Sequence, residues 1–274
     1  MRRAALLRLA TIGCAATVGC AGVHRYHPNF YSVDGDIRLG QQLAKEVDSD
    51  LTLLRLSALT QLVNTIGTRL RDASPHPAFR LFPYTFHVVD SPEVNAFALP
   101  GGPIYVNSAL IEICDTEDQL ASVLAHEMSH VAARHATEML TTQNVTQLAV
   151  IAAISIVPVP IPPIAWEGTK LAYVLGLLHY SRGKEAEADH LGLELMNAAG
   201  YDPGEMAIVF RKLSEQQKSL PSVVERFFSS HPLSEDRMRD AERRAAALPR
   251  PANAPVATAR ASTFSQVNLM FTKD

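Results

Sequence analysis

The stretch His126-Glu127-Met128-Ser129-His130 carries an HExxH pattern near the middle of the chain. On an α-helix, residues i and i+4 lie one turn apart on the same face, so the two imidazoles can bind one zinc ion. Glu127 lies between them in sequence, and its carboxylate can accept a proton from a water molecule on the metal. The motif therefore predicts a helix that carries a hydrolytic zinc site.

The expected position of Glu127 on this helix argues against the alternative, a coincidental surface pair of histidines. At the helical period, Glu127 falls on an apolar stripe that consists of Leu120, Val123, Leu124 and Val131. A carboxylate on a core-facing stripe costs on the order of several kcal/mol unless a metal or hydrogen bonds compensate for its burial. We therefore expect Glu127 to be buried beside the metal.

A second acidic motif offers the further ligand that a catalytic zinc needs beside its open position for water. Glu185 and Asp189 lie four residues apart on a helix predicted over about residues 182–199. Glu185 can bind the metal, while Asp189 can accept the free N–H of a ligating histidine and so fix its tautomer. The alternative is an exposed acidic face. Glu187 points away from both at the helical period, so we expect it to stay on the surface.

The surrounding pattern predicts an α+β domain that is mostly helical and has a small β-sheet. Helical periodicity covers residues 34–70, and a proline-rich segment at 73–79 ends it. Alternating residues predict short strands at 84–90 and 104–107, on either side of a Pro-Gly-Gly-Pro turn at 100–103. Thr116 to Gln119 fits a capping box, which predicts one helix from residue 115 or 116 to about Leu140.

The first 19 residues have a basic start and an apolar run, as a secretory signal peptide does. The run ends in Thr17-Val18-Gly19-Cys20, which resembles a bacterial lipobox. We expect Cys20 to be lipidated, residues 20–33 to form a tether and Ala21 to favour sorting to the outer membrane. Ordinary cleavage shortly after Cys20 is the alternative. Residues 246–274, rich in Ala and Pro, are expected to form a loosely held tail.

Residues 145–166 form the most hydrophobic stretch of the chain, and four prolines interrupt it from residue 158 onward. It is too short and too broken to span a bilayer. Two interpretations stay open, a lid over the active site or a buried core helix.

The composition excludes several classes of protein. The chain has 274 residues, of which 47% are hydrophobic, and its 25 Lys and Arg nearly balance 28 Asp and Glu. This balance gives no basic footprint for nucleic acid, and the apolar content opposes disorder. Three cysteines cannot form a disulfide framework or a four-cysteine zinc site.

Several motifs together carry a resemblance to a known family. In chain order they are NAFALPGG (95–102), HEMSHVAARH (126–135), SRGKEAEAD (181–189), AGYDP (199–203) and HPLS (231–234) with Arg237. In this combination the chain resembles the zinc metallopeptidases related to the CAAX prenyl proteases, in particular the soluble periplasmic BepA- and LoiP-like branch, here without tetratricopeptide repeats. The resemblance implies a zincin-like domain over 34–245 and one zinc ion per chain, with Glu185 as the third ligand.

The resemblance also implies a place in envelope quality control. Misfolded envelope proteins would be the substrates, and the outer-membrane assembly machinery is a candidate partner. The resemblance further implies that His231 lies near the metal, where its imidazole can fill the open coordination position or stabilise the oxyanion. His135 is interpreted as a packing residue.

We expect one strand, formed by Ile104, Tyr105, Val106 and Asn107, to pair with an extended substrate through main-chain hydrogen bonds. Two other classes of function stay open. One is a zinc-plugged, chaperone-like lipoprotein that binds unfolded chains without cutting them. The other is a structural envelope lipoprotein with an accidental motif.

Overall fold

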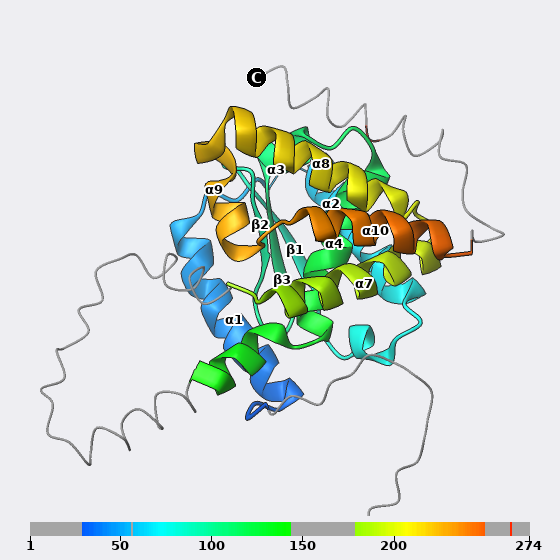
Figure 1. Cartoon of the computed structure of the whole chain (residues 1–274). Coiled ribbons are helices and arrows are strands. Elements are labelled where there is room, and N and C mark those ends of the chain that lie inside the picture. Colours follow the sequence, from blue (N-terminus) through cyan, green and yellow to red (C-terminus); the bar gives the residue numbers. More distant parts are fainter. Residues whose placement is uncertain (1–28, 56, 144–178, 250–263, 265–274) are drawn as a thin grey trace, which may run out of the picture.

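The computed structural model describes residues 29–55, 57–143, 179–249 and 264 (Figure 1). The predicted α+β class is confirmed, because helices surround one small sheet. In chain order the elements are α1 (Val33–Asp50), α2 (Ser57–Ala73), the 3-10 helix η1 (Pro77–Arg80), β1 (Thr85–Val89), β2 (Ala96–Ala98), β3 (Pro103–Asn107), α3 (Ser108–Glu112), α4 (Glu117–Ala132), α7 (Arg182–Ala198), α8 (Gly204–Ser219), α9 (Pro221–Ser230) and α10 (Glu235–Ala247).

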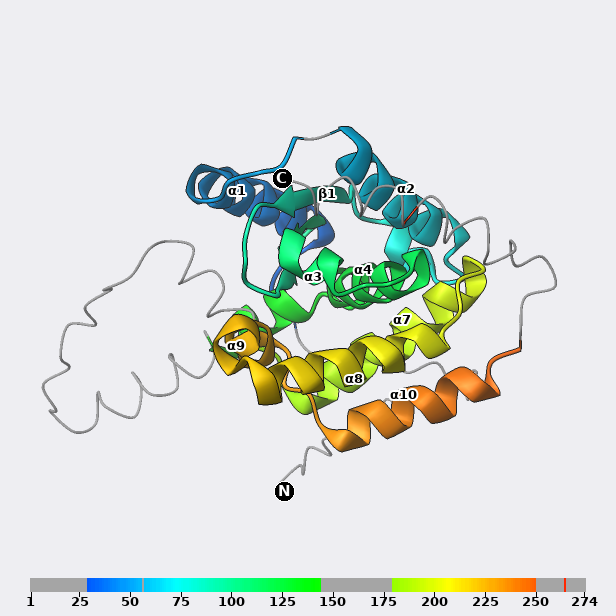
Figure 2. The same cartoon turned by 90° about the horizontal axis from the view of Figure 1, so that it is seen from above.

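The helix that carries the HExxH motif, α4, lies at the centre of the molecule. Figure 2 shows α2 and the sheet on one side of it, α7 and α8 on the other, and α10 outside α7 and α8. Every residue of α4 is buried, and its N-terminus is capped by the Thr116 side chain, which accepts from the Gln119 N–H as predicted. Because α4 is buried on all sides, the polar side chains of the motif must find their partners inside the protein.

α4 and α7 pack closely together, and this brings the HExxH motif of α4 next to the acidic ExxxD motif of α7. Gly192 of α7 faces the backbone of α4, and a Cβ atom there would lie 3.4 Å from the carbonyl carbon of Ala125 and from the nitrogen of His126. A methyl group at Gly192 would just touch the backbone of α4 and would lie 3.0 Å from Cε of Met206, so α7 packs against α4 with little room for a larger side chain at this point. The helix ends as predicted near Gly200, which has a φ of 76°.

The sheet has the strand order β1-β3-β2, and this corrects one expectation about substrate binding. β3, which contains Ile104 to Asn107, pairs in parallel with β1 and antiparallel with β2. Both of its edges are occupied, so β3 cannot pair with a substrate. Among the residues that the structure describes, no strand pairs with the outer edge of β2, a strand that the sequence did not reveal.

The helix predicted from residue 115 or 116 to Leu140 is also wrong in one respect, because it breaks after Ala132. Arg134 has a φ of 60°, and a helix resumes at residues 135–143. The Arg134 side chain pairs with the buried carboxylate of Asp36, with Nε 2.6 Å from Oδ2 and Nη2 3.1 Å from Oδ1. This ion pair holds a non-glycine residue in the left-handed conformation, which costs about 1 kcal/mol or more.

Several expectations concern the two ends of the chain. The Asn29 side chain and the Phe30 N–H donate hydrogen bonds to Thr137 and Thr141, so the last residues of the expected tether lie against the helix at 135–143. Phe264, in the expected tail, is buried in the core. The expected signal peptide, Cys20 and the apolar segment 145–166 lie outside the described residues. Within the part of the chain that the structure describes, no helix combines the length and the hydropathy needed to cross a membrane.

Candidate metal centre

Four buried side chains from three parts of the chain converge on one point. His126 and His130 come from α4, Glu185 from the first turn of α7, and His231 from the residue that ends α9. Each offers one ligand atom, and these atoms all lie within 4.8 Å of one another. His130 Nε2 lies 3.1 Å from His126 Nε2 and 3.3 Å from Glu185 Oε1, while His231 Nδ1 lies 3.1 Å from Glu185 Oε1.

The unpartnered polar atoms around this point test whether a metal ion fits. Both carboxylate oxygens of Glu127 and Nε2 of His231 are buried without a hydrogen-bond partner among the described residues. Buried polar atoms without partners are costly, so a cluster of them points to a missing ligand. Imidazole nitrogens together with a carboxylate oxygen are the donors that zinc takes in catalytic sites. The residues therefore fit a zinc ion.

Asp189 lies where the sequence placed it, one turn along α7 from Glu185. Its Oδ1 is 3.0 Å from Nδ1 of His126, the ring nitrogen that faces away from the other ligand atoms. Burial opposes ionisation of this carboxyl, but His126 and Arg237 lower its pKa below the usual value. Asp189 is therefore a charged carboxylate that forms an ion pair with His126 on the side of the ring away from the other ligand atoms.

Arg237 of α10, which was assigned no role from the sequence, holds both acids of α7. Its Nη1 lies 2.6 Å from Glu185 Oε2, and its Nε and Nη2 lie 2.7 and 2.8 Å from the two oxygens of Asp189. All three side chains are buried. The guanidinium fork thereby fixes the spacing of the two carboxylates on α7.

The two histidines of α4 differ in their electrostatics. Burial lowers the pKa of an imidazole, but Asp189 and Glu185 outweigh this at His126 and raise its pKa to about 10. At His130 burial dominates and the pKa is well below the usual value, despite Glu185. The two carboxylates therefore favour the charged form of His126, whereas burial favours the neutral form of His130, the form that binds metal.

Glu127 is buried, as its place on the apolar stripe predicted. It is not one of the four residues whose ligand atoms converge. Its Oε1 lies 3.4 Å from Nε2 of His231, without the geometry of a hydrogen bond. The carboxylate thus stands next to the fourth position of the cluster, where it can accept a proton from a water molecule.

Two residues beside His130 were missed from the sequence. The ring of Tyr180 stacks on that of His130, with 3.9 Å between the centroids and 17° between the planes. His135, interpreted as packing, brings its Nδ1 to 2.9 Å from Nδ1 of His130. The fifth residue after His130 would face another direction on an unbroken helix, so only the break at Arg134 could have indicated this contact.

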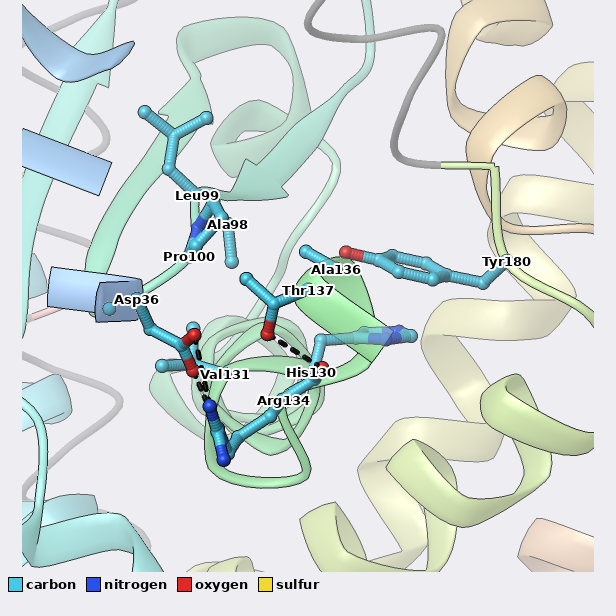
Figure 3. A pocket seen from close by; sticks show the side chains of 11 residues that line it. Asp36, Ala98, Leu99, Pro100, His130, Val131, Arg134, Ala136, Thr137 and Tyr180 are labelled. Carbon is cyan, nitrogen blue, oxygen red and sulfur yellow. Dashed lines mark hydrogen bonds and ion pairs between the residues drawn. The ribbon is translucent and has the colours of Figure 1, made fainter. Parts of the chain in front are cut away.

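A small pocket adjoins the cluster on the side of His130. Its walls come from the start of α1, the end of β2 and the turn after α4, as Figure 3 shows. Arg134 turns toward Asp36 on one side, while His130 and Tyr180 lie on the other. The pocket connects the end of β2 with a ligand of the cluster.

Comparison with known proteins agrees with this geometry. The model of peptidase family M48 matches residues 58–245. The beta-barrel assembly-enhancing protease of Yersinia pestis is 32% identical over 220 residues, which cover 78% of this chain and 44% of that protein. The protein of the same name from Escherichia coli K12 is 33% identical over 222 residues, with the same coverage of both chains.

A eukaryotic relative shows the same similarity. The mitochondrial metalloendopeptidase OMA1 of Schizosaccharomyces pombe is 32% identical over 221 residues, which cover 78% of this chain and 62% of that protein. The chain spans less than half the length of the bacterial relatives named above. The family match includes α4, α7 and the His231 segment that build the cluster, and on this basis the chain belongs to peptidase family M48.

Proposed function

We propose that this chain is a zinc-dependent metalloendopeptidase. The observation that supports it best is the buried cluster of His126, His130 and Glu185 next to the carboxylate of Glu127, which receives no hydrogen bond from any described residue. We assign the first three as ligands of a single zinc ion and Glu127 as the general base. Asp189 orients His126 through the ring nitrogen that does not bind metal.

The proposed mechanism uses Glu127 twice. When bound, zinc supplies a Lewis acid that polarises the attacking water and the scissile carbonyl. Glu127 takes a proton from that water as it attacks the carbonyl carbon, and then passes the proton to the leaving amine. No residue that the structure describes donates a hydrogen bond to this buried carboxylate, which keeps it available for both transfers.

The substrate is proposed to pair with β2 in place of β3. The Leu99 N–H donates to the Pro103 carbonyl and the Asn107 N–H to the Asn95 carbonyl, so the main-chain groups of Ala96 and Ala98 point away from β3. An extended peptide can pair with these groups, which gives affinity through the main chain and little selectivity for sequence. The edge of β2 leads to the pocket beside His130.

His231 is proposed to regulate the site as a fourth ligand. Its Nδ1 lies 3.3 Å from His126 Nε2, within the group of ligand atoms, which supports a role in which the imidazole would fill the position that a catalytic zinc keeps open for water. The residue ends α9 and precedes Pro232, which places the imidazole on a loop. Displacement of this loop would open the site. The other role open to this imidazole is stabilisation of the oxyanion.

We expect His231→Ala to raise basal proteolysis several-fold, because it removes the side chain that competes with water for the metal. Cleavage of an unfolded protein and self-cleavage during storage, both followed by gel electrophoresis, measure this. A His231→Ala protein that keeps zinc but loses activity would instead identify the imidazole as a stabiliser of the transition state.

Substrate and location are proposed from the bacterial relatives, whose names describe proteases that enhance β-barrel assembly. We propose that this chain cleaves misfolded envelope proteins in the periplasm, in contact with outer-membrane assembly machinery. A lipid on Cys20 would anchor it to the outer membrane, and two or more acyl chains make such attachment stable. Mass spectrometry of the mature N-terminus tests the anchor, and an unmodified start beyond Cys20 would exclude it.

Cleavage of casein by the purified protein tests the proposed activity. We expect fragments to form, a zinc chelator to stop their formation and added zinc to restore it. The two alternatives predict a different result. A chaperone-like protein would bind casein without cutting it, and a structural lipoprotein would leave it unbound and intact.

A further inference from the structure

We propose that His135 and Glu187 are positioning residues for the zinc ligand His130, and that they act as a hydrogen-bonded chain behind its ring. The inference rests on the proposed zinc site. Sequence patterns assigned packing to His135 and solvent to Glu187, and the structure brings both to the metal centre. Nδ1 of His135 lies 2.9 Å from Nδ1 of His130, and Nε2 of His135 lies 3.4 Å from Oε2 of Glu187.

The direction of these hydrogen bonds follows from the ring nitrogen that faces the metal. Nε2 of His130 points at His126 and Glu185, so this nitrogen carries the lone pair for zinc. Nδ1 of His130 must then carry the proton and donate it to Nδ1 of His135. His135 in turn carries its proton on Nε2 and donates to the carboxylate of Glu187. Each of the two contacts then has one donor and one acceptor, so the hydrogen-bond directions agree from His130 to the carboxylate of Glu187.

The break in the helix after α4 makes this contact possible. Five residues on an unbroken helix are about 140° and 7.5 Å apart, so the side chains of His130 and His135 could not meet. The left-handed residue Arg134, held by Asp36, turns the chain back and brings the two ring centroids to 5.0 Å. The strained residue thus has a function at the site.

Burial indicates that the chain is more than a surface contact. His135 is 1% exposed, and the side chain of Glu187 is 21% exposed. Both histidines of α4 thus have a buried partner on the ring nitrogen that faces away from the ligand cluster. His126 faces Asp189, and His130 faces His135. Such partners fix the tautomer and the orientation of the ligand ring and raise its basicity.

Zinc affinity of variant proteins, measured by competition with a chromophoric chelator, tests the proposal without relying on activity. His135→Phe keeps a ring but has no acceptor, and we expect its zinc dissociation constant to rise about 10- to 100-fold. His135→Asn places an amide oxygen where Nδ1 stood, so it can accept from His130 and should recover most of the loss. Glu187→Gln keeps a weaker acceptor and should cause a smaller rise than His135→Phe.

A matched control is available on the same helix. Glu194 also accepts from a histidine, with Oε2 2.6 Å from Nε2 of His76, but it is not part of the ligand cluster. Glu194→Gln should leave zinc affinity unchanged. The visible spectrum of the cobalt-substituted protein gives a second readout, because a changed ligand orientation shifts its bands in His135→Phe and in Glu187→Gln.

The outcomes separate this inference from the proposed function. If wild-type protein binds zinc but His135→Phe binds it equally well, or His135→Asn is as weak as His135→Phe, the positioning role is wrong and the zinc site stands. If Glu187→Gln matches the Glu194→Gln control in both affinity and cobalt spectrum, the chain ends at His135 and the role of Glu187 is wrong. If wild-type protein binds no zinc, both the inference and the proposed function fail.

Discussion

Glu127→Gln should reduce peptidase activity by about 10²- to 10⁴-fold while the protein keeps its zinc, because an amide cannot accept the proton of the attacking water. Glutamine has nearly the same shape as glutamate, and Glu127 supplies no atom to the ligand cluster. No donor in the described part of the chain hydrogen-bonds to Glu127, so removal of this buried negative charge should also leave the fold intact. Casein cleavage and zinc content, measured on the same preparation, check both parts.

Glu117→Gln is the control for this experiment. Glu117 is buried at the start of α4 and accepts a hydrogen bond from the Tyr201 hydroxyl at 2.9 Å. It lies ten residues before Glu127, about 15 Å along the helix, so the same substitution should leave cleavage unchanged. If Glu127→Gln cleaves casein at the wild-type rate, the general base lies elsewhere. If it loses zinc, Glu127 holds the metal centre together in a way that the geometry does not show.

Arg237→Ala should lower the free energy of unfolding by about 3–5 kcal/mol, the usual cost of removing one partner from a buried ion pair. Arg237 is 7% exposed and is a permanent cation that pairs with both Glu185 and Asp189. Without it, two buried carboxylates lie one turn apart on α7, and in the metal-free protein His126 compensates for only part of their charge. Denaturant unfolding of the metal-free protein measures the effect directly.

Arg239→Ala is the matched control on α10. Its guanidinium is 65% exposed and pairs with Glu235, which is also exposed. Exposed pairs of this kind contribute little to stability, so the variant should unfold like the wild type. Equal stability of Arg237→Ala and Arg239→Ala would show that the buried guanidinium does not hold the acids of α7. A loss of zinc affinity in Arg237→Ala would accompany the loss of stability, since Glu185 is no longer fixed.

The parts of the site that the sequence predicted are those that a local period can express. HExxH and ExxxD place their residues one helical turn apart, and the apolar stripe of α4 predicted the burial of Glu127. The class of fold followed from the lengths of the helical and alternating segments. These features depend on neighbours within about ten residues, which is the range over which pattern and structure correspond.

The parts that the sequence could not predict depend on contacts between distant segments. The helix breaks at Arg134 although no glycine, asparagine or proline marks the position. The ion pair that stabilises this break could not be predicted, because its partner Asp36 lies 98 residues away in the sequence. β2 has only three residues, two of them alanine, so its composition does not favour a strand. Because β2 was not predicted, the sequence could not show that β3 is the central strand or that β2 forms the outer edge of the sheet.

Arg237 and His135 illustrate the same limit at the metal centre. Arg237 was part of a recognised motif, but its contacts to Glu185 and Asp189 require α10 to pack outside α7. His135 follows the zinc motif in sequence, and its return to His130 requires the break that the ion pair of Arg134 stabilises. In both cases the sequence showed the residue but could not predict which side chain it contacts.

Zinc content of the wild-type protein and of Glu185→Ala, measured by elemental analysis after dialysis, tests the central claim most directly. Glu185 is fully buried and pairs with both histidines of α4. We predict one zinc ion per wild-type chain, loss of that zinc in Glu185→Ala, and full retention in Glu194→Ala, a change on the same helix outside the cluster. One zinc ion in Glu185→Ala, or none in the wild type, would contradict the assignment of His126, His130 and Glu185 as the metal site.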